Sequence, residues 1–198
     1  MSSMSPAKHL SVVAMLFLSL SMAVATFQSS VGRTMSKEDI ILKTEKLTHF
    51  HFFFHVIISG PNIDDVNAAL PPPTSTTPAA NAFFGRVDSL DTPLTIGPNI
   101  SSDRIGSMQG VVVGASPVEE LAYFMEVIFV FTEGKYNGST LVMVGRNQAT
   151  MKLRELPIVG GTGIFRFARG YALTRTYSPF DNKTGTAIYE YDLYALHY

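Results

Sequence analysis

Residues of two kinds alternate along the segment 48–56, and the alternation gives each face a distinct character. One face carries histidines and the other is aromatic and aliphatic: His49, His51, Phe53 and His55 on the first, and Phe50, Phe52, Phe54 and Val56 on the second. Aromatic and β-branched residues favour strands. The pattern therefore predicts a β-strand with one aromatic face.

Further short apolar runs follow, separated by Gly, Pro, Asn and Asp. We expect strands at residues 82–87, 106–115, 121–132, 139–145, 150–158, 164–177 and 186–197. An Asn-Gly step in 133–138 predicts a hairpin loop, and the prolines of 70–78 predict a surface loop. No helical period intervenes. Regularly spaced strands with turn signals predict an all-β barrel or sandwich, and an eight-stranded barrel can enclose one small ligand.

The amino-terminal segment has the pattern of a secretory signal peptide. Lys8 and His9 precede an uncharged apolar stretch that closes on the small-residue pattern Ala23-Val24-Ala25. A membrane anchor is the alternative, but a spanning helix needs roughly 20 apolar residues and serines interrupt this run. We therefore expect a signal peptide at 1–25, a mobile leader at 26–45 and a β-barrel domain at 46–198. A secreted protein of the extracellular space follows, with no membrane-bound part.

Composition narrows the classes of function. Lys plus Arg number 15 and Asp plus Glu number 16, so no basic excess points to nucleic acid. There is no cysteine, which excludes disulfides, thiolate metal sites and cysteine chemistry. Asn-x-Ser/Thr triplets in turn-like contexts predict glycosylation at Asn99, Asn137 and Asn182.

Two patterns resemble binding sites and are better explained without one. The three histidines of 48–56 come from a single strand with no carboxylate at matching spacing, so we expect surface or interface histidines and no metal. The glycine-rich run 160–163 leads into an expected strand, so no helix amino terminus would face a phosphate there. We expect a tight turn at this run.

The later strands carry motifs in a defined order. They are Phe84-Gly85, Leu90-Asp91-Thr92-Pro93-Leu94-Thr95, Gly106-Ser107-Met108-Gln109-Gly110, the run 129–141, Gly145-Arg146-Asn147, the long block 154–172, Tyr189-Glu190-Tyr191 and Leu196-His197-Tyr198. The chain resembles the plant dirigent proteins, of the disease-resistance-response type, over residues 47–198.

This resemblance implies an extracellular, eight-stranded antiparallel β-barrel, related in fold to the allene oxide cyclases and usually trimeric; a homodimer is the other option. It implies a ligand such as a phenoxy radical or a quinone methide derived from a monolignol like coniferyl alcohol. A separate laccase or peroxidase in the cell wall would make the radical, so the protein itself would need no cofactor.

The resemblance also implies which residues face the ligand. The polar candidates are Arg154, Asp91 and Asn147, and the substrate-binding candidates are Phe52, Phe54, Val56 and Phe165. The pinoresinol-forming members place aspartates at the positions of Val56 and Asn147, so this chain departs from that subgroup. Valine cannot donate a proton and asparagine is no acid near neutral pH.

Three functions stay open on these grounds. The first is a guide that imposes stereoselectivity on phenoxy-radical coupling of monolignols in lignan or lignin biosynthesis. The second is a cyclase or dehydratase that closes a pterocarpan-type ring in an isoflavanol. The third is a cell-wall protein that binds phenolics without chemistry.

Overall fold

The barrel domain occupies one compact unit, Lys43–Tyr198. The computed structural model describes residues 34, 36, 44–58, 65–69, 83–116 and 120–198. The expected signal peptide, nearly all of the expected leader and the proline-rich segment 70–78 lie outside the described residues. The strands are β1 Lys46–Ile57, β2 Asp65–Ala69, β3 Val87–Thr95, β4 Arg104–Gly114, β5 Ala122–Phe131, β6 Thr140–Gln148, β7 Arg154–Thr162, β8 Arg169–Asp181 and β9 Thr186–His197.

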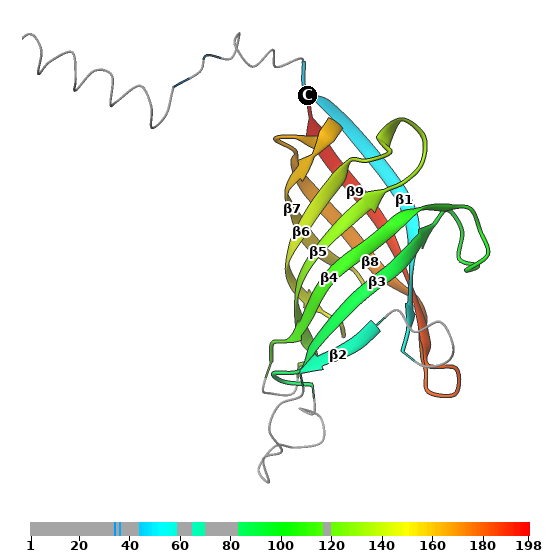
Figure 1. The fold of residues 1–198 in the computed structure, drawn as a ribbon. Helices are drawn as coiled ribbons and strands as arrows, with labels where there is room; N and C mark the ends of the chain where they lie inside the picture. The colour runs from blue at the N-terminus through cyan, green and yellow to red at the C-terminus, as the bar shows by residue number, and fades with distance from the viewer. Residues whose placement is uncertain (1–33, 35, 37–43, 59–64, 70–82, 117–119) are drawn as a thin grey trace, which may run out of the picture. The chain divides into compact units, whose positions relative to one another are not determined.

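The strands form one closed antiparallel barrel (Figure 1). Hydrogen-bonded neighbours run in the order β1-β9-β8-β7-β6-β5-β4-β3, and β3 returns to β1 through Phe53↔Thr95 and Phe54↔Leu94. One additional strand, β2, lies outside the closed ring of eight and pairs with the first half of β3. The prediction of an eight-stranded antiparallel barrel is confirmed. No helix in the described part of the chain is long and apolar enough to cross a membrane.

The strand expected at 82–87 is wrong, because the strand in this region is β3, which begins at Val87. Residues 83–85 form a turn instead. Pro93 explains why the sequence pattern did not predict this strand. It lies opposite Ser107 of β4, on a stretch of β3 whose other edge pairs with neither β1 nor β2. A proline is tolerated in a strand where an edge lacks a partner.

The glycine-rich run and the strand after it also differ from expectation. Gly160 and Gly161 belong to β7, and the turn is the 3-10 helix η3, Gly163–Phe165. The strand expected from residue 164 therefore begins only at Arg169. At Gly161, a Cβ atom would lie 2.5 Å from the carbonyl oxygen of Thr140, so only glycine lets β7 approach β6 so closely here.

The two faces of β1 lie as the alternation predicts, with Phe52 and Phe54 buried inside the barrel. Two residues of the outer face are buried as well. His55 is 3% exposed and Phe53 is 7% exposed. Both lie where β1 meets β3: the ring of Phe53 packs edge-on against Tyr177, and His55 is hydrogen-bonded to Thr95. The closure of the barrel buries these two side chains, and the local sequence pattern does not predict that closure.

Aromatic side chains fill one end of the barrel. We call this group the plug: Phe50, Phe131, Tyr136, Phe165 and His197. Two of its rings come from the 3-10 turns, Tyr136 from η2 (Gly134–Tyr136) and Phe165 from η3. These two rings stack with centroids 5.4 Å apart, and Phe165 is fully buried. The turns thus close this end of the barrel with side chains.

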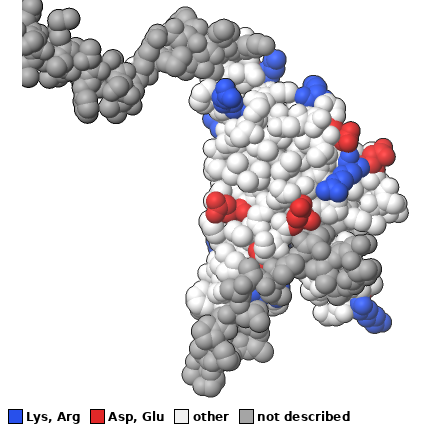
Figure 2. Space-filling model, viewed as in Figure 1, with Lys and Arg blue, Asp and Glu red and all other residues white. Residues whose placement is uncertain are grey.

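The outer surface carries charge unevenly. Figure 2 shows that the face in view is largely uncharged. Exposed apolar side chains project from the outside of the sheet at Phe124 and Ile128 of β5 and at Val159 of β7. By contrast, the outside of β8 and β9 holds ion pairs of Arg175 with Glu190 and Asp192.

Candidate functional site: an aromatic pocket with two polar poles

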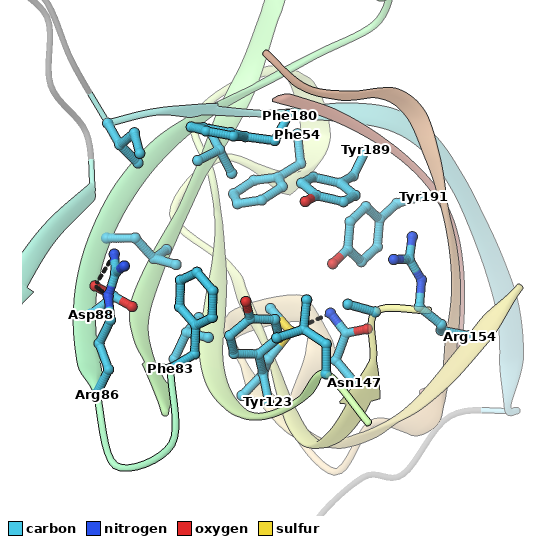
Figure 3. Close-up of a pocket in the computed structure, with 17 residues that line it drawn as sticks. Phe54, Phe83, Arg86, Asp88, Tyr123, Asn147, Arg154, Phe180, Tyr189 and Tyr191 are labelled. Atoms are coloured by element: carbon cyan, nitrogen blue, oxygen red, sulfur yellow. Dashed lines mark hydrogen bonds and ion pairs between the residues drawn. The ribbon is translucent and has the colours of Figure 1, made fainter. Parts of the chain in front are cut away.

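A cavity of about 380 Å³ occupies the half of the barrel that the plug leaves open. Volumes of roughly 300–1,000 Å³ are typical of small-molecule sites. Rings supply much of the wall, namely Phe54, Phe83, Tyr123, Phe180, Tyr189 and Tyr191. Aliphatic side chains and methionine add to it, and four charged or amide side chains also line the cavity: Arg86, Asp88, Asn147 and Arg154, all labelled in Figure 3.

Arg154 stands at the start of β7 and is buried, with 4% of its surface exposed. Its Nε donates to the backbone oxygen of Thr174 over 3.4 Å, and its guanidinium carbon lies 5.5 Å from the centre of the Tyr189 ring. Its Nη2 is buried without a hydrogen-bond partner, and no carboxylate among the described residues forms an ion pair with it. A buried cation without a partner is costly, so Nη2 is a donor suited to a ligand oxygen.

Asn147 of β6 is the neighbouring polar group of the pocket wall (Figure 3). Its Nδ2 donates to the sulfur of Met125 over 3.1 Å, and its Oδ1 is buried without a partner. The amide therefore offers an acceptor to the cavity. Together, Arg154 and Asn147 present one unused donor and one unused acceptor, and we call this pair the amide–guanidinium pole.

Tyr191 of β9 links the pocket to the packed interior. Its ring stacks on Phe52 at 5.5 Å with an angle of 5° between the planes. Burial raises the pKa of Tyr191 to about 12, although Arg154 acts in the opposite direction. The phenol therefore stays protonated at neutral pH. Tyr191 can stack against a ligand ring but cannot serve as a base there.

The second pole is an ion pair between Arg86, which directly precedes β3, and Asp88 of β3. Nε and Nη2 of Arg86 both lie 2.7 Å from Oδ1 of Asp88. The guanidinium also lies over the ring of Phe83, with 5.4 Å between the guanidinium carbon and the ring centre. Asp88 is 7% exposed. The sequence did not indicate either residue as a pocket group, because no strand was expected at Asp88 and Arg86 lies just outside the strand that the structure shows.

The structure places the expected site residues in different environments. Phe54, Val56, Asn147 and Arg154 line the cavity. Phe52 and Phe165 belong instead to the packed core, and Phe165 is part of the plug. Asp91 does not face the cavity; it is exposed and accepts a hydrogen bond from Gln109. Asp91 points away because it lies an odd number of residues from Asp88 along β3.

The aromatic residues of β9 were also missed as pocket groups. Tyr189 and Tyr191 are separated by one residue, so they share the inner face of their strand. The alternation that marks the inner face of 48–56 marks these two residues as well. On β3, Asp88 and Leu90 alternate in the same way, but this pattern indicates a strand only when Pro93 is accepted inside it.

The histidines do not gather into a metal site. His49 and His51 lie on the outer surface, where both are hydrogen-bonded to Oδ1 of Asp192, at 2.9 and 3.0 Å. Burial by itself raises the pKa of Asp192, but the bonds to His51 and His49 outweigh it and the net pKa is lowered. Among the described residues, no group of three or more histidine, cysteine or acidic side chains is arranged to hold a metal ion.

The expected glycosylation sites are all exposed: Asn99, Asn137 and Asn182. Asn99 lies in the turn after β3, where its Oδ1 accepts hydrogen bonds from the amide and the hydroxyl of Ser101. Asn137 follows η2, and Asn182 follows β8. Glycan attachment stays a prediction.

Comparison with known proteins identifies the family to which this chain belongs. Residues 47–196 match the family model of the dirigent-like proteins. Dirigent protein 21 of Arabidopsis thaliana is 42% identical, the match covering 92% of this chain and 94% of that protein. Pterocarpan synthase 1 of Glycyrrhiza echinata is 41% identical, over 92% and 93% of the two chains. The solved structure of a pterocarpan synthase dirigent protein superposes with a TM-score of 0.71 at 40% identity, covering 84% of this chain and 89% of that one. The chain therefore belongs to the dirigent protein family.

Proposed function

We propose that this protein closes a ring in a phenolic substrate of the isoflavanol type, and that the barrel pocket controls the stereochemistry of the closure. The observation that carries the proposal is the amide–guanidinium pole. Nη2 of Arg154 and Oδ1 of Asn147 are both buried without partners, in a cavity otherwise walled largely by rings. A flat ligand that bears oxygen would satisfy both atoms and stack on the walls.

The chemistry of ring closure suits such a pocket. A phenolic oxygen of the substrate forms a bond to the carbon that loses its hydroxyl group, and the phenolic proton leaves with that hydroxyl as water. No oxidant is required. Negative charge that develops on the oxygen of the departing hydroxyl group would be stabilised by the guanidinium of Arg154 at short range in a dry site. The family includes proteins named pterocarpan synthases at 41% and 42% identity, which supports this choice.

Stereoselective coupling of phenoxy radicals from a monolignol is the second candidate. The observation that favours it is the chemical nature of the residues at positions 56 and 147. Val56 and Asn147 line the pocket without supplying an acid, and radical coupling needs orientation more than proton donation. A laccase or peroxidase would then have to supply the radicals.

One experiment separates these candidates. The purified protein is incubated with a racemic isoflavanol without oxidant and, separately, with coniferyl alcohol with and without laccase. The products are resolved by chiral chromatography. An optically enriched pterocarpan without oxidant supports ring closure. An optically enriched coupling product that needs laccase supports the second candidate. Binding without either product indicates a phenolic-binding protein, and the absence of binding overturns the proposal.

We further propose that the protein is secreted into the cell wall and associates with other copies of itself, as a homotrimer or a homodimer. The apolar amino-terminal stretch supports secretion. The exposed side chains of Phe124, Ile128 and Val159 support association, and Figure 2 shows that one face of the molecule is largely uncharged. Sedimentation at micromolar concentration tests it, and a monomer alone would contradict association.

A further inference from the structure

The ion pair of Arg86 and Asp88 lies on the wall of the pocket. Asp88 is the second residue of β3 and Arg86 directly precedes the strand, and both side chains line the pocket. Arg86 contacts a single carboxylate oxygen, Oδ1, through two of its nitrogens. Oδ2 of Asp88 thus lies outside that ion pair. The ion pair engages Oδ1 alone, so Oδ2 is the carboxylate oxygen that a further donor would meet.

Stability alone does not account for this pair. Asp88 is buried and Arg86 is partly buried, and taking charges out of water costs free energy that their attraction often fails to recover. The next inward position of the strand is Leu90, which is 6% exposed and packs in the core. An apolar residue at position 88 would continue that pattern. A buried carboxylate on the cavity wall against this pattern is a candidate for a function.

The pair faces the amide–guanidinium pole from the other side of the barrel. In the closed order of strands, β3 and β7 are separated by β4, β5 and β6 in one direction and by β1, β9 and β8 in the other. They therefore lie across the barrel from each other. Figure 3 shows Asp88 and Arg154 on opposite walls, with the rings of Phe54, Tyr123 and Tyr189 between them.

We propose that Asp88 accepts a hydrogen bond from a phenolic hydroxyl at the end of the ligand remote from Arg154. The pocket then selects aromatic ligands that bear oxygen at both ends, with a free hydroxyl at the end that meets β3. This inference rests on the proposed function and deepens it by naming the substrate class. A methyl ether cannot donate to a carboxylate, so methylation at this end of the ligand removes the interaction.

The proposal also explains how the pocket has a carboxylate although Val56 and Asn147 are not acids. The carboxylate comes from β3, whereas those residues belong to β1 and β6. Because Arg86 binds Asp88 directly, the carboxylate acts as an acceptor. Asp88 is in this sense a specificity-determining residue.

The test compares the binding of two unreactive probes by titration calorimetry. They are an isoflavan with free phenols on both terminal rings and its monomethyl ether at the ring remote from the bond that would close. We expect the wild-type protein to bind the free phenol about tenfold more tightly or better, the range of a hydrogen bond to a charged group. In Asp88→Asn the carbonyl oxygen stays with Arg86 and the amide N–H groups face the ligand, so the preference should fall to about twofold or less. Asp91→Asn, on the same strand but exposed, is the matched control and should keep the preference.

The outcomes distinguish the two proposals. Equal binding of both probes by the wild-type protein overturns the role of Asp88, whatever the variant does. An unchanged preference in a folded Asp88→Asn protein, checked by near-ultraviolet circular dichroism, overturns it as well. In either case ring closure of an isoflavanol still stands if turnover is observed. If the wild-type protein binds neither probe, the role of Asp88 is overturned, and turnover of the isoflavanol then decides the proposed function separately.

Discussion

The two halves of the barrel interior are built from the same kinds of side chain and differ in how completely these fill the space. In the plug, five rings pack against one another, with Phe165 at their centre and fully buried. In the pocket, rings line a cavity of about 380 Å³, and Arg154 and Asn147 keep buried atoms without partners. The contrast teaches that aromatic content does not separate a core from a binding site. Packing and unsatisfied polar atoms do.

The largest effect is expected from a substitution that disrupts the packing of the plug. Phe165→Ala should lower the free energy of unfolding by about 3–5 kcal/mol, because it leaves a cavity among four other rings. Urea denaturation followed by fluorescence measures the loss. The matched control is Phe180→Ala at the pocket, where the ring is 43% exposed and the loss should be at most about 1 kcal/mol. Equal losses in the two variants would contradict the distinction between plug and pocket.

The next largest effect is a loss of catalytic rate without a loss of folding stability. Arg154→Met should reduce kcat of the ring closure about a hundredfold, the range seen when one donor to a developing oxyanion is lost. The free energy of unfolding should stay the same or rise, because a buried cation without an acidic partner is removed. Turnover and urea denaturation are measured side by side. Arg166→Met, at an exposed arginine, is the control and should change neither quantity. A large loss of stability in Arg154→Met would assign the guanidinium to the structure instead.

A smaller effect tests the chemistry of the pocket wall. Val56→Asp introduces a carboxyl group beside the ligand, and burial there favours the protonated form, which can donate a proton. We expect a change of about tenfold in the rate of product formation or in the ratio of products, the lower part of the range for acid catalysis. Chiral chromatography measures both. In the control Val56→Asn, the introduced side chain has nearly the same shape as aspartate but is not an acid. An identical change in that variant would rule out proton donation as the cause.

The smallest expected effect is a pH dependence of folding stability, and it arises outside the cavity, where β1 meets β3. Burial lowers the pKa of His55 below its ordinary 6.5. The unfolded chain therefore takes up a proton more readily than the folded one, and the contribution of neutral His55 to stability is complete above pH 6.5 and is lost as the pH falls below it. Thr95 donates its hydroxyl to the carbonyl oxygen of Gly97, so the hydrogen bond from His55 is donated by Nε2.

The measurement compares urea midpoints at about pH 7.5 and about pH 5, on either side of the ordinary histidine value. His55→Gln keeps a donor for Thr95 without a titrating group, so the difference between the two midpoints should shrink in this variant. The same difference in both proteins would show that other groups dominate the acid sensitivity.

Alternation is local, so the sequence predicted the all-β class and the two faces of β1, whereas Arg154 and Asn147 were expected in a pocket only through the resemblance to the dirigent family. The sequence did not determine β3, since Pro93 reads as a turn and becomes part of a strand only where one edge of the sheet lacks a partner. Nor did it separate Phe54 from Phe165, which look alike as apolar aromatics. Only the closure of the barrel decided that one ring would line a cavity and the other fill a plug. Closure also brought Asp88 across from Arg154, because their distance depends on the order of strands around the ring and not on their separation along the chain.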